Sequence, residues 1–213
     1  IVNNNKRLNV NSDKIFFKII SPNFDLKYGL SEKEIHERFK KLVRYSDPDK
    51  NRKTIFIWPE GVFSGYSYRE ILTFKELISN NFSKKHLIIF GTNKFDQETG
   101  NFFNSMLIVD NNLKIVQSYN KRKLVPFGEF LPFEDLLSKL GLKKITEGYG
   151  SYIRGKENKN LIIDKLNILP LICYEIIFTD LIQSSSKNTN LIINISEDGW
   201  FGQSIGPDQH FSK

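Results

Sequence analysis

Alanine is absent from the 213 residues of this chain, and cysteine occurs only once, as Cys173. A single thiol excludes an internal disulfide framework and a zinc site built from several cysteines. The three histidines, His36, His86 and His210, are far apart in the sequence, so no motif for a metal site is present. We therefore expect neither a metal nor a cofactor.

Long apolar stretches are also lacking. The longest, such as 87–90 and 168–173, fall far below the roughly 18 to 20 apolar residues that are needed to span a bilayer. We expect no membrane helix in this chain, and its first residues show no pattern of a secretory signal. Because the chain starts at Ile1, we expect it to be part of something longer.

Negative charge is the scarcer sign, because 24 acidic residues stand against 31 Lys and Arg, for a net charge of +7. Such an excess suits an anionic partner, either nucleic acid or a phospholipid surface. However, abundant Asn, Lys, Ile and Phe beside the missing alanine indicate a compositional bias that raises the lysine content everywhere. We therefore expect no nucleic-acid partner. With 39% hydrophobic and 26% charged residues, the composition is that of a folded globular protein.

Residues 1–13 are polar and rich in asparagine, which predicts a flexible arm, and residues 14–213 show no repeat or linker that would divide them. Stretches rich in β-branched and aromatic residues indicate strands. These stretches are 14–20, 54–58, 86–90 (closed by Gly91), 101–110, 113–119, 161–163, 168–173 and 190–195, with a short one at Ile153. Asn111 and Asn112 predict a tight turn, and Pro170 indicates a bulge or a sheet edge.

Helices are expected between these strands. Ser31 and Glu34 form a capping-box pattern, and apolar residues then recur at helical spacing, which predicts a helix that begins after Ser31. Further helices are expected at 68–79, 134–140 and 174–185. Strands that alternate with helices in this way predict an α/β layered fold.

A carboxylate follows the predicted strand 54–58 at the point where the chain turns, a place where α/β proteins commonly locate function. This residue, Glu60, comes directly after Pro59 and beside apolar and aromatic surface. Desolvation there would raise the pKa of its carboxyl group toward the range useful to a general base. The alternative is a solvated loop carboxylate.

A basic run, Lys121-Arg122-Lys123, follows the predicted strand 113–119. One interpretation is a solvated loop. The other is that the Lys121 ammonium lies beside a nucleophile and stabilises the oxyanion that forms when a carbonyl group is attacked. Glu129, eight positions further on, is able to orient that lysine.

The single cysteine, Cys173, closes the strand 168–173 and precedes Tyr174 and Glu175, where a helix is expected to begin. A helix N-terminus favours the thiolate, the nucleophilic form of cysteine. The alternative is a buried cysteine that packs as a small hydrophobic residue. Together the glutamate, the lysine and this cysteine can supply the base, the oxyanion stabiliser and the nucleophile of an acyl-transfer reaction.

These residues lie in the segments Trp58-Pro59-Glu60, Tyr119 to Pro132, and Ile172-Cys173-Tyr174-Glu175. In order and spacing the segments resemble the Glu-Lys-Cys signatures of the nitrilase, or carbon-nitrogen hydrolase, superfamily. Within that superfamily, the runs 124–132 and 194–202 with 206–210 look like those of the apolipoprotein N-acyltransferases. The resemblance covers the chain from about residue 14 to its end.

The resemblance implies a nitrilase-like α-β-β-α sandwich that is incomplete at its C-terminus, because the acyltransferases continue past the match to 206–210. It implies a domain that faces the periplasm and is carried by a protein of the bacterial inner membrane, with membrane segments outside this chain. The implied partners are a phospholipid acyl donor and an apolipoprotein acceptor, whose diacylglyceryl-cysteine amine receives the fatty acyl chain.

The resemblance also assigns roles by matching motif. Glu60 is the general base, Lys121 stabilises the oxyanion, and Cys173 is the nucleophile that becomes a thioester. The supporting residues are Glu129, Tyr174 and Glu175.

The chain departs from the acyltransferase pattern at three positions. The acyltransferases usually have Asn and Ala where this chain has Glu197 and Gly199, and often His where it has Lys123. Two alternative functions stay open. One is a soluble amidase of the same superfamily, which would use water as acceptor, and the other is a non-catalytic truncated remnant. The run 124–132, together with the run 200–210, favours the acyltransferase over the amidase.

Overall fold

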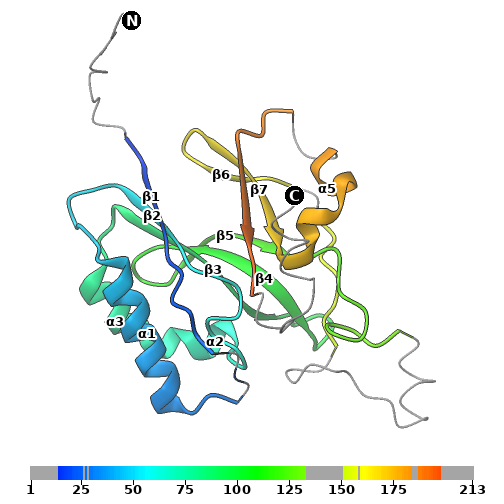
Figure 1. Ribbon diagram of the computed structural model, residues 1–213, viewed down its shortest axis with the longest axis horizontal. Helices are drawn as coiled ribbons and strands as arrows, with labels where there is room; N and C mark the ends of the chain where they lie inside the picture. The colour runs from blue at the N-terminus through cyan, green and yellow to red at the C-terminus, as the bar shows by residue number, and fades with distance from the viewer. Residues whose placement is uncertain are drawn as a thin grey trace, which may run out of the picture.

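The structure is a computed structural model of the chain, and it describes residues 14–25, 27, 29–132, 151–157, 159–183 and 187–197. The predicted arm 1–13 and the predicted helix 134–140 lie outside these ranges. Two β-sheets face each other across an apolar core, and helices cover their outer faces (Figure 1). This is the layered α/β arrangement that the sequence predicts.

The larger sheet has five strands in the order β1-β2-β3-β4-β5. They are β1 (Phe16–Ile19), β2 (Thr54–Ile57), β3 (His86–Phe95), β4 (Phe102–Val109) and β5 (Ile115–Asn120). The first three are parallel to one another, whereas β3, β4 and β5 form an antiparallel meander. The strands predicted at these places are confirmed, except that β3 continues through Gly91 instead of ending there.

The smaller sheet has three strands in the order β6-β7-β8. They are β6 (Leu161–Ile163), β7 (Leu166–Ile172) and β8 (Leu191–Ile195). β7 is antiparallel to β6 and parallel to β8. The pairing with β6 stops at Ile168, so Pro170 has a sheet-edge environment on that side although β7 is the middle strand.

Ser31 caps α1 (Glu32–Ser46) with the predicted capping box, in which Ser31 and Glu34 hydrogen-bond each other reciprocally. α1 lies on the outer face of the larger sheet with α2 (Tyr68–Ile71), the 3-10 turn η1 (Leu72–Phe74) and α3 (Lys75–Asn81) (Figure 1). The helix predicted over 68–79 is confirmed as helical structure, but a 3-10 turn divides it into α2, η1 and α3. The chain tightens at η1, where Phe74 stacks on Phe39 of α1 with ring centroids 4.4 Å apart.

The 3-10 turn η2 (Cys173–Ile177) and α5 (Thr179–Gln183) follow the smaller sheet. The prediction of one helix over 174–185 is wrong within the described residues, because Phe178 is extended, with ψ 97°, and divides the segment. The predicted strand at Ile153 is only an isolated bridge between Tyr152 and Phe102. In the turn before β5 the left-handed residue is Leu113, with φ +58°, rather than either asparagine.

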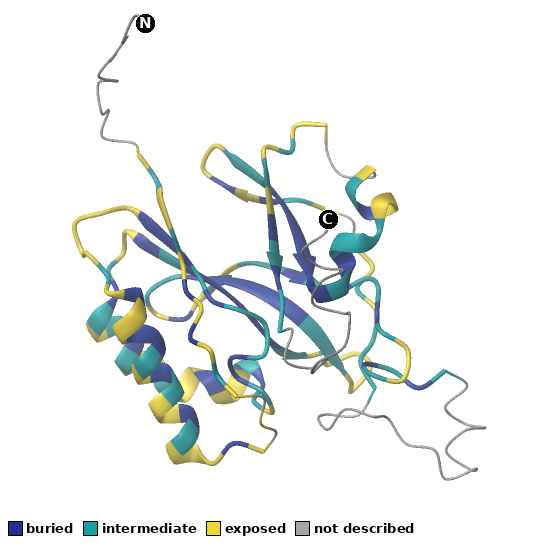
Figure 2. Ribbon diagram, viewed as in Figure 1, coloured by how far each residue is buried: buried dark blue, intermediate teal, exposed yellow. Residues whose placement is uncertain are grey.

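Three apolar clusters fill the spaces between the layers (Figure 2). The first joins Phe39 of α1 to Trp58 and the helix side of the larger sheet. The second lies between the sheets and includes Ile108 of β4 and Ile172 of β7. The third joins β7 to Leu181 of α5. The order of layers is therefore helix, sheet, sheet, helix. Among the described residues, no helix is long and apolar enough to cross a bilayer.

Candidate active site

The three candidate catalytic residues stand just beyond the ends of three strands. Glu60 follows β2, Lys121 follows β5 and Cys173 follows β7. β2 and β5 belong to the larger sheet, whereas β7 belongs to the smaller one. The residues therefore come together only because the two sheets face each other.

Glu60 lies in a narrow space beside Gly91 of β3. A Cβ atom added to Gly91 would come within 2.9 Å of the Glu60 Cα atom, so a glycine here lets β3 pass close to the loop that carries Glu60. The Glu60 side chain is 12% exposed. Burial raises the pKa of its carboxyl group to about 7, against the opposing effect of Lys121 and with a further increase from Glu129.

The Lys121 ammonium is buried between two carboxylates. Its Nζ lies 3.1 Å from Oε1 and 3.0 Å from Oε2 of Glu129, and 4.0 Å from Oε1 of Glu60. Burial by itself would lower the pKa of this ammonium, but the negative charges of Glu60 and Glu129 outweigh burial and raise it. Lys121 is therefore protonated at neutral pH. The alternative of a solvated loop lysine is wrong, because the residue is 1% exposed.

Asn104 of β4 connects the two glutamates, and none of the sequence motifs includes it. Its Nδ2 donates to Oε1 of Glu60 at 2.8 Å and to Oε1 of Glu129 at 2.7 Å. The other Glu60 oxygen, Oε2, is buried and has no hydrogen-bond partner among the described residues. A polar residue on the strand face that carries Met106 and Ile108 is the signal that would have identified Asn104. This arrangement leaves Oε2 of Glu60 to accept a proton.

Cys173 has φ +54°, in the left-handed region. For a residue other than glycine, this backbone conformation costs about 1 to 3 kcal/mol of conformational free energy. It begins a short 3-10 turn, not an α-helix. Burial raises the pKa of its thiol to about 12, Glu60 adds to the increase, and Lys121 opposes it. The expectation that a helix N-terminus favours the thiolate is therefore wrong, and the neutral thiol needs a base to react.

The Glu175 carboxylate connects the loop after β5 to the end of β7 by hydrogen bonds. Its buried carboxylate accepts hydrogen bonds of 2.7 to 3.0 Å from the Tyr119 hydroxyl and from the backbone N–H groups of Arg122, Lys123 and Ile172. Burial raises the pKa of Glu175, and these donors oppose the increase. Tyr174 packs against the core between the sheets. Glu175 thus connects the backbone on either side of the site.

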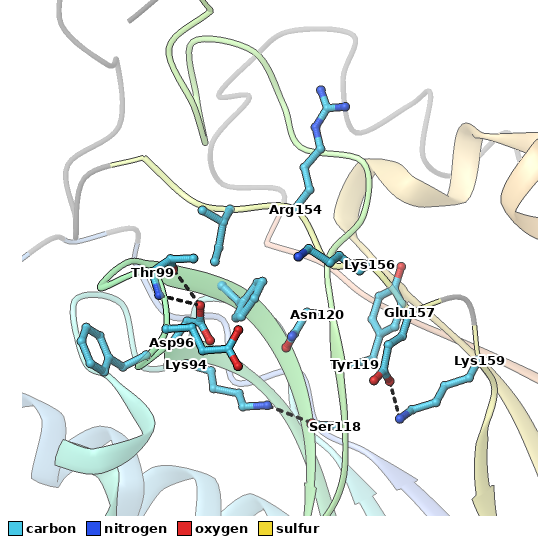
Figure 3. A pocket seen from close by; sticks show the side chains of 14 residues that line it. Lys94, Asp96, Thr99, Ser118, Tyr119, Asn120, Arg154, Lys156, Glu157 and Lys159 are labelled. Atoms are coloured by element: carbon cyan, nitrogen blue, oxygen red, sulfur yellow. Dashed lines mark hydrogen bonds and ion pairs between the residues drawn. The ribbon is translucent and has the colours of Figure 1, made fainter.

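A groove of about 590 Å³ lies beside β5 (Figure 3). Ser118 and Asn120 line the groove from the face of β5 that is turned away from the core between the sheets. The Lys94 ammonium donates a hydrogen bond to the Ser118 hydroxyl at 3.3 Å. Arg154 and Lys156 line it from the segment 151–157. None of the three candidate catalytic residues is part of its lining. The groove is therefore distinct from the candidate active site.

The family model described as carbon-nitrogen hydrolase matches residues 30–212. The chain belongs to the carbon-nitrogen hydrolase family. The chain is 31% identical over 209 residues to the apolipoprotein N-acyltransferase of Allorhizobium ampelinum, and the match covers 94% of this chain and 39% of the relative. The chain is 34% identical over 211 residues to the apolipoprotein N-acyltransferase of Bradyrhizobium diazoefficiens. That match covers 92% of this chain and 39% of the relative.

The fold of this chain is similar to that of a solved structure. The carbon-nitrogen hydrolase from Helicobacter pylori G27 matches with a TM-score of 0.61 and 13% identity, over 93% of this chain and 66% of that chain. At this identity the likeness concerns the fold alone, and it confirms the predicted nitrilase-like architecture. The chain spans about two fifths of the length of the two curated acyltransferases, at 39% of each.

Proposed function

We propose that this chain is the catalytic domain of an apolipoprotein N-acyltransferase, which moves an acyl chain from a phospholipid to the N-terminal amine of an apolipoprotein. The observation that carries the proposal is a buried Lys121 ammonium within electrostatic range of Glu60 and Cys173. Relatives of that name, at 31% and 34% identity, support the choice of reaction.

In the first half-reaction, Oε2 of Glu60 takes the proton of the Cys173 thiol while the sulfur attacks the ester carbonyl carbon of the phospholipid. The Lys121 ammonium stabilises the negative charge that develops on the carbonyl oxygen. The ester C–O bond then breaks, and the proton held by Glu60 passes to the departing alkoxide of the lysophospholipid. A thioester remains on Cys173.

In the second half-reaction, the acceptor amine attacks the thioester carbonyl carbon. Glu60 takes a proton from the attacking nitrogen, and the C–S bond breaks as the amide bond forms. The proton on Glu60 then returns to the sulfur, which restores the thiol. A pKa of about 7 suits Glu60 to this exchange, because the carboxylate can both take and give a proton near neutral pH.

The loop 124–132 supports a lipid donor. The Val125 N–H donates to Oε2 of Glu129 at 2.9 Å, so the loop holds the carboxylate that binds Lys121. In the same loop Phe127 is 45% exposed, which leaves an apolar ring at the surface close to the site. An exposed aromatic ring is a favourable contact for an acyl chain. The proposal places the domain at the periplasmic side of the bacterial inner membrane, where the phospholipid donor and the lipid-modified acceptor meet.

The proposal is tested with two acyl donors, a p-nitrophenyl ester and phosphatidylethanolamine in detergent micelles, and with a diacylglyceryl-cysteine peptide as acceptor. Intact-protein mass spectrometry is expected to show an acyl adduct on the wild-type chain and none on Cys173→Ala. Adding the peptide is expected to consume the adduct and to yield the N-acylated peptide.

Two results would contradict the proposal in different ways. An adduct that disappears at the same rate with and without peptide indicates water as acceptor, and hence the amidase. An adduct that persists in Cys173→Ala, or no adduct with either donor, removes the thioester mechanism itself.

A further inference from the structure

Glu197 is a third carboxylate at the candidate active site, beside Glu60 and Glu129. It stands two positions beyond the end of β8, which runs parallel to β7 with Ile195 paired to Ile172. The two strands therefore bring Ser196 next to Cys173, and the Ser196 side chain hydrogen-bonds the thiol. Glu197 is the next residue along the chain.

The Glu197 side chain reaches from the smaller sheet to the loop that carries Glu60. Gly61 directly follows Glu60 and has φ +68°. A Cβ atom added to Gly61 would lie 2.9 Å from Cγ and 3.2 Å from Oε2 of Glu197, so this side chain rests on the bare backbone of Gly61. Because Gly61 has no side chain, the carboxylate of Glu197 can come next to Glu60, the candidate base.

The charged and titratable groups around Glu60 come from several elements. They are Lys121 after β5, Glu129 in the following loop, Glu197 after β8 and the Cys173 thiol after β7. Arg38 of α1 interacts electrostatically with Glu197, and its guanidinium also donates to the Val62 carbonyl oxygen at 3.5 Å. Two carboxylates therefore act on Glu60 against one buried ammonium.

We infer that Glu197, whose side chain rests on Gly61 next to the candidate base, is a positioning residue that acts through Glu60, and this inference rests on Glu60 being the base of the proposed reaction. A negative charge next to a carboxylate favours its protonated form, because ionising both groups places two like charges close together. A base with a higher proton affinity removes the thiol proton of Cys173 more effectively once it is ionised. Glu197 thereby shifts the working range of the base toward neutral pH.

The test removes the charge of Glu197 and keeps its shape, with Glu197→Gln. Cys173 is the only cysteine in the sequence, so its alkylation by iodoacetamide can be followed by intact-protein mass spectrometry at a series of pH values. We expect the acidic limb of the alkylation rate to move to lower pH by about half a unit to one unit in Glu197→Gln. A second neutral variant, Glu197→Asn, is expected to move the limb in the same direction.

Glu98→Gln is the matched control, because it removes the same charge from an exposed residue on the connection between β3 and β4. It is expected to leave the limb in place. An unmoved limb in both Glu197 variants, or an equal shift in Glu98→Gln, would overturn the inference. The alkylation assay uses no acyl donor or acceptor, so its failure is distinguishable from failure of the proposed acyl transfer.

Discussion

At the scale of single residues, Glu175 is the group whose loss should disturb the site without touching the reacting atoms. Three backbone N–H groups and one hydroxyl point at its carboxylate. Glu175→Gln replaces one acceptor oxygen by an NH₂ group that faces those donors, which leaves buried polar groups unsatisfied. We expect a loss of about 1 to 3 kcal/mol in the free energy of unfolding, measured with urea.

The control for this prediction is Glu157→Gln. Glu157 is exposed and pairs with Lys159 at the surface, where an ion pair contributes little, so its unfolding midpoint should stay unchanged. Equal midpoints for Glu175→Gln and the wild type would show that the carboxylate is not needed to hold the two loops.

The pH dependence of Cys173 follows from the two pKa values at the site. The thiol, with a pKa near 12, stays protonated at neutral pH, so its reaction depends on the ionised fraction of Glu60, whose pKa is about 7. Below pH 7 the alkylation rate should fall about tenfold per unit as Glu60 becomes protonated. Glu60→Gln should remove this limb, and alkylation should then increase only in alkaline solution. A limb of unchanged position in Glu60→Gln would show that another group is the base.

The three candidate catalytic residues could be predicted from the sequence because each comes at or just after the end of a predicted strand. Glu129, the partner of Lys121, could also be predicted, but the other partners could not. Asn104, Ser196 and Glu197 reach the site from strands that are distant in sequence, and only the pairing of strands and the facing of the sheets bring them in. The thiol pKa was also beyond sequence reasoning, since burial and neighbouring carboxylates decide it rather than the turn that follows.

At the scale of elements, the segment 151–157 holds the end of β5 in place. The Gly155 N–H donates to the Lys121 carbonyl oxygen at 2.8 Å. A Cβ atom added to Gly155 would collide with the carbonyl group of Asn120, whose carbon would be only 2.8 Å away. Gly155→Ala should therefore displace the backbone that carries Lys121. Since a displacement of about 1 Å can cost 100-fold in rate, we expect thioester formation to fall by about 10- to 100-fold.

Gly128→Ala is the matched control for Gly155→Ala. A Cβ atom at Gly128 would meet only Val125, at 3.5 Å or more, which is an ordinary van der Waals contact. Thioester formation is measured for both variants with the p-nitrophenyl ester, and circular dichroism checks the fold. Similar rates for Gly155→Ala and the wild type would mean that the segment yields without moving Lys121.

Helices and strands that depend on a local sequence pattern could be predicted, whereas those that depend on tertiary contacts could not. The capping box at Ser31 is local, and α1 begins where it predicts. Gly91 is a strand terminator by local rules, yet β3 continues through it because Gly91 pairs with Met106 of β4. The glycine at this position leaves space for Glu60. The sequence around Phe74 is compatible with a helix, but the 3-10 turn η1 interrupts the helix where Phe74 stacks on Phe39.

At the scale of the whole molecule, the core between the sheets assembles the site. Ile108 of β4 is fully buried in that core. Ile108→Ala should lower the free energy of unfolding by about 2 to 5 kcal/mol, because it removes buried methyl groups and leaves a cavity. Val116→Ala on β5 is the control, since Val116 is 49% exposed and should change stability much less. Urea unfolding of both variants measures the difference, and equal losses would contradict this account of the core.

The candidate catalytic residues are divided between two sheets, so the site can be lost without unfolding of either sheet. Each sheet keeps its own hydrogen-bonded ladder, so a partial opening between them would separate Glu60 from Cys173 while most of the secondary structure survives. The far-ultraviolet signal would then outlast the reaction of the thiol that Glu60 assists. The single cysteine therefore reports whether the sheets are docked, because the limb near pH 7 in its alkylation rate requires Glu60 beside it.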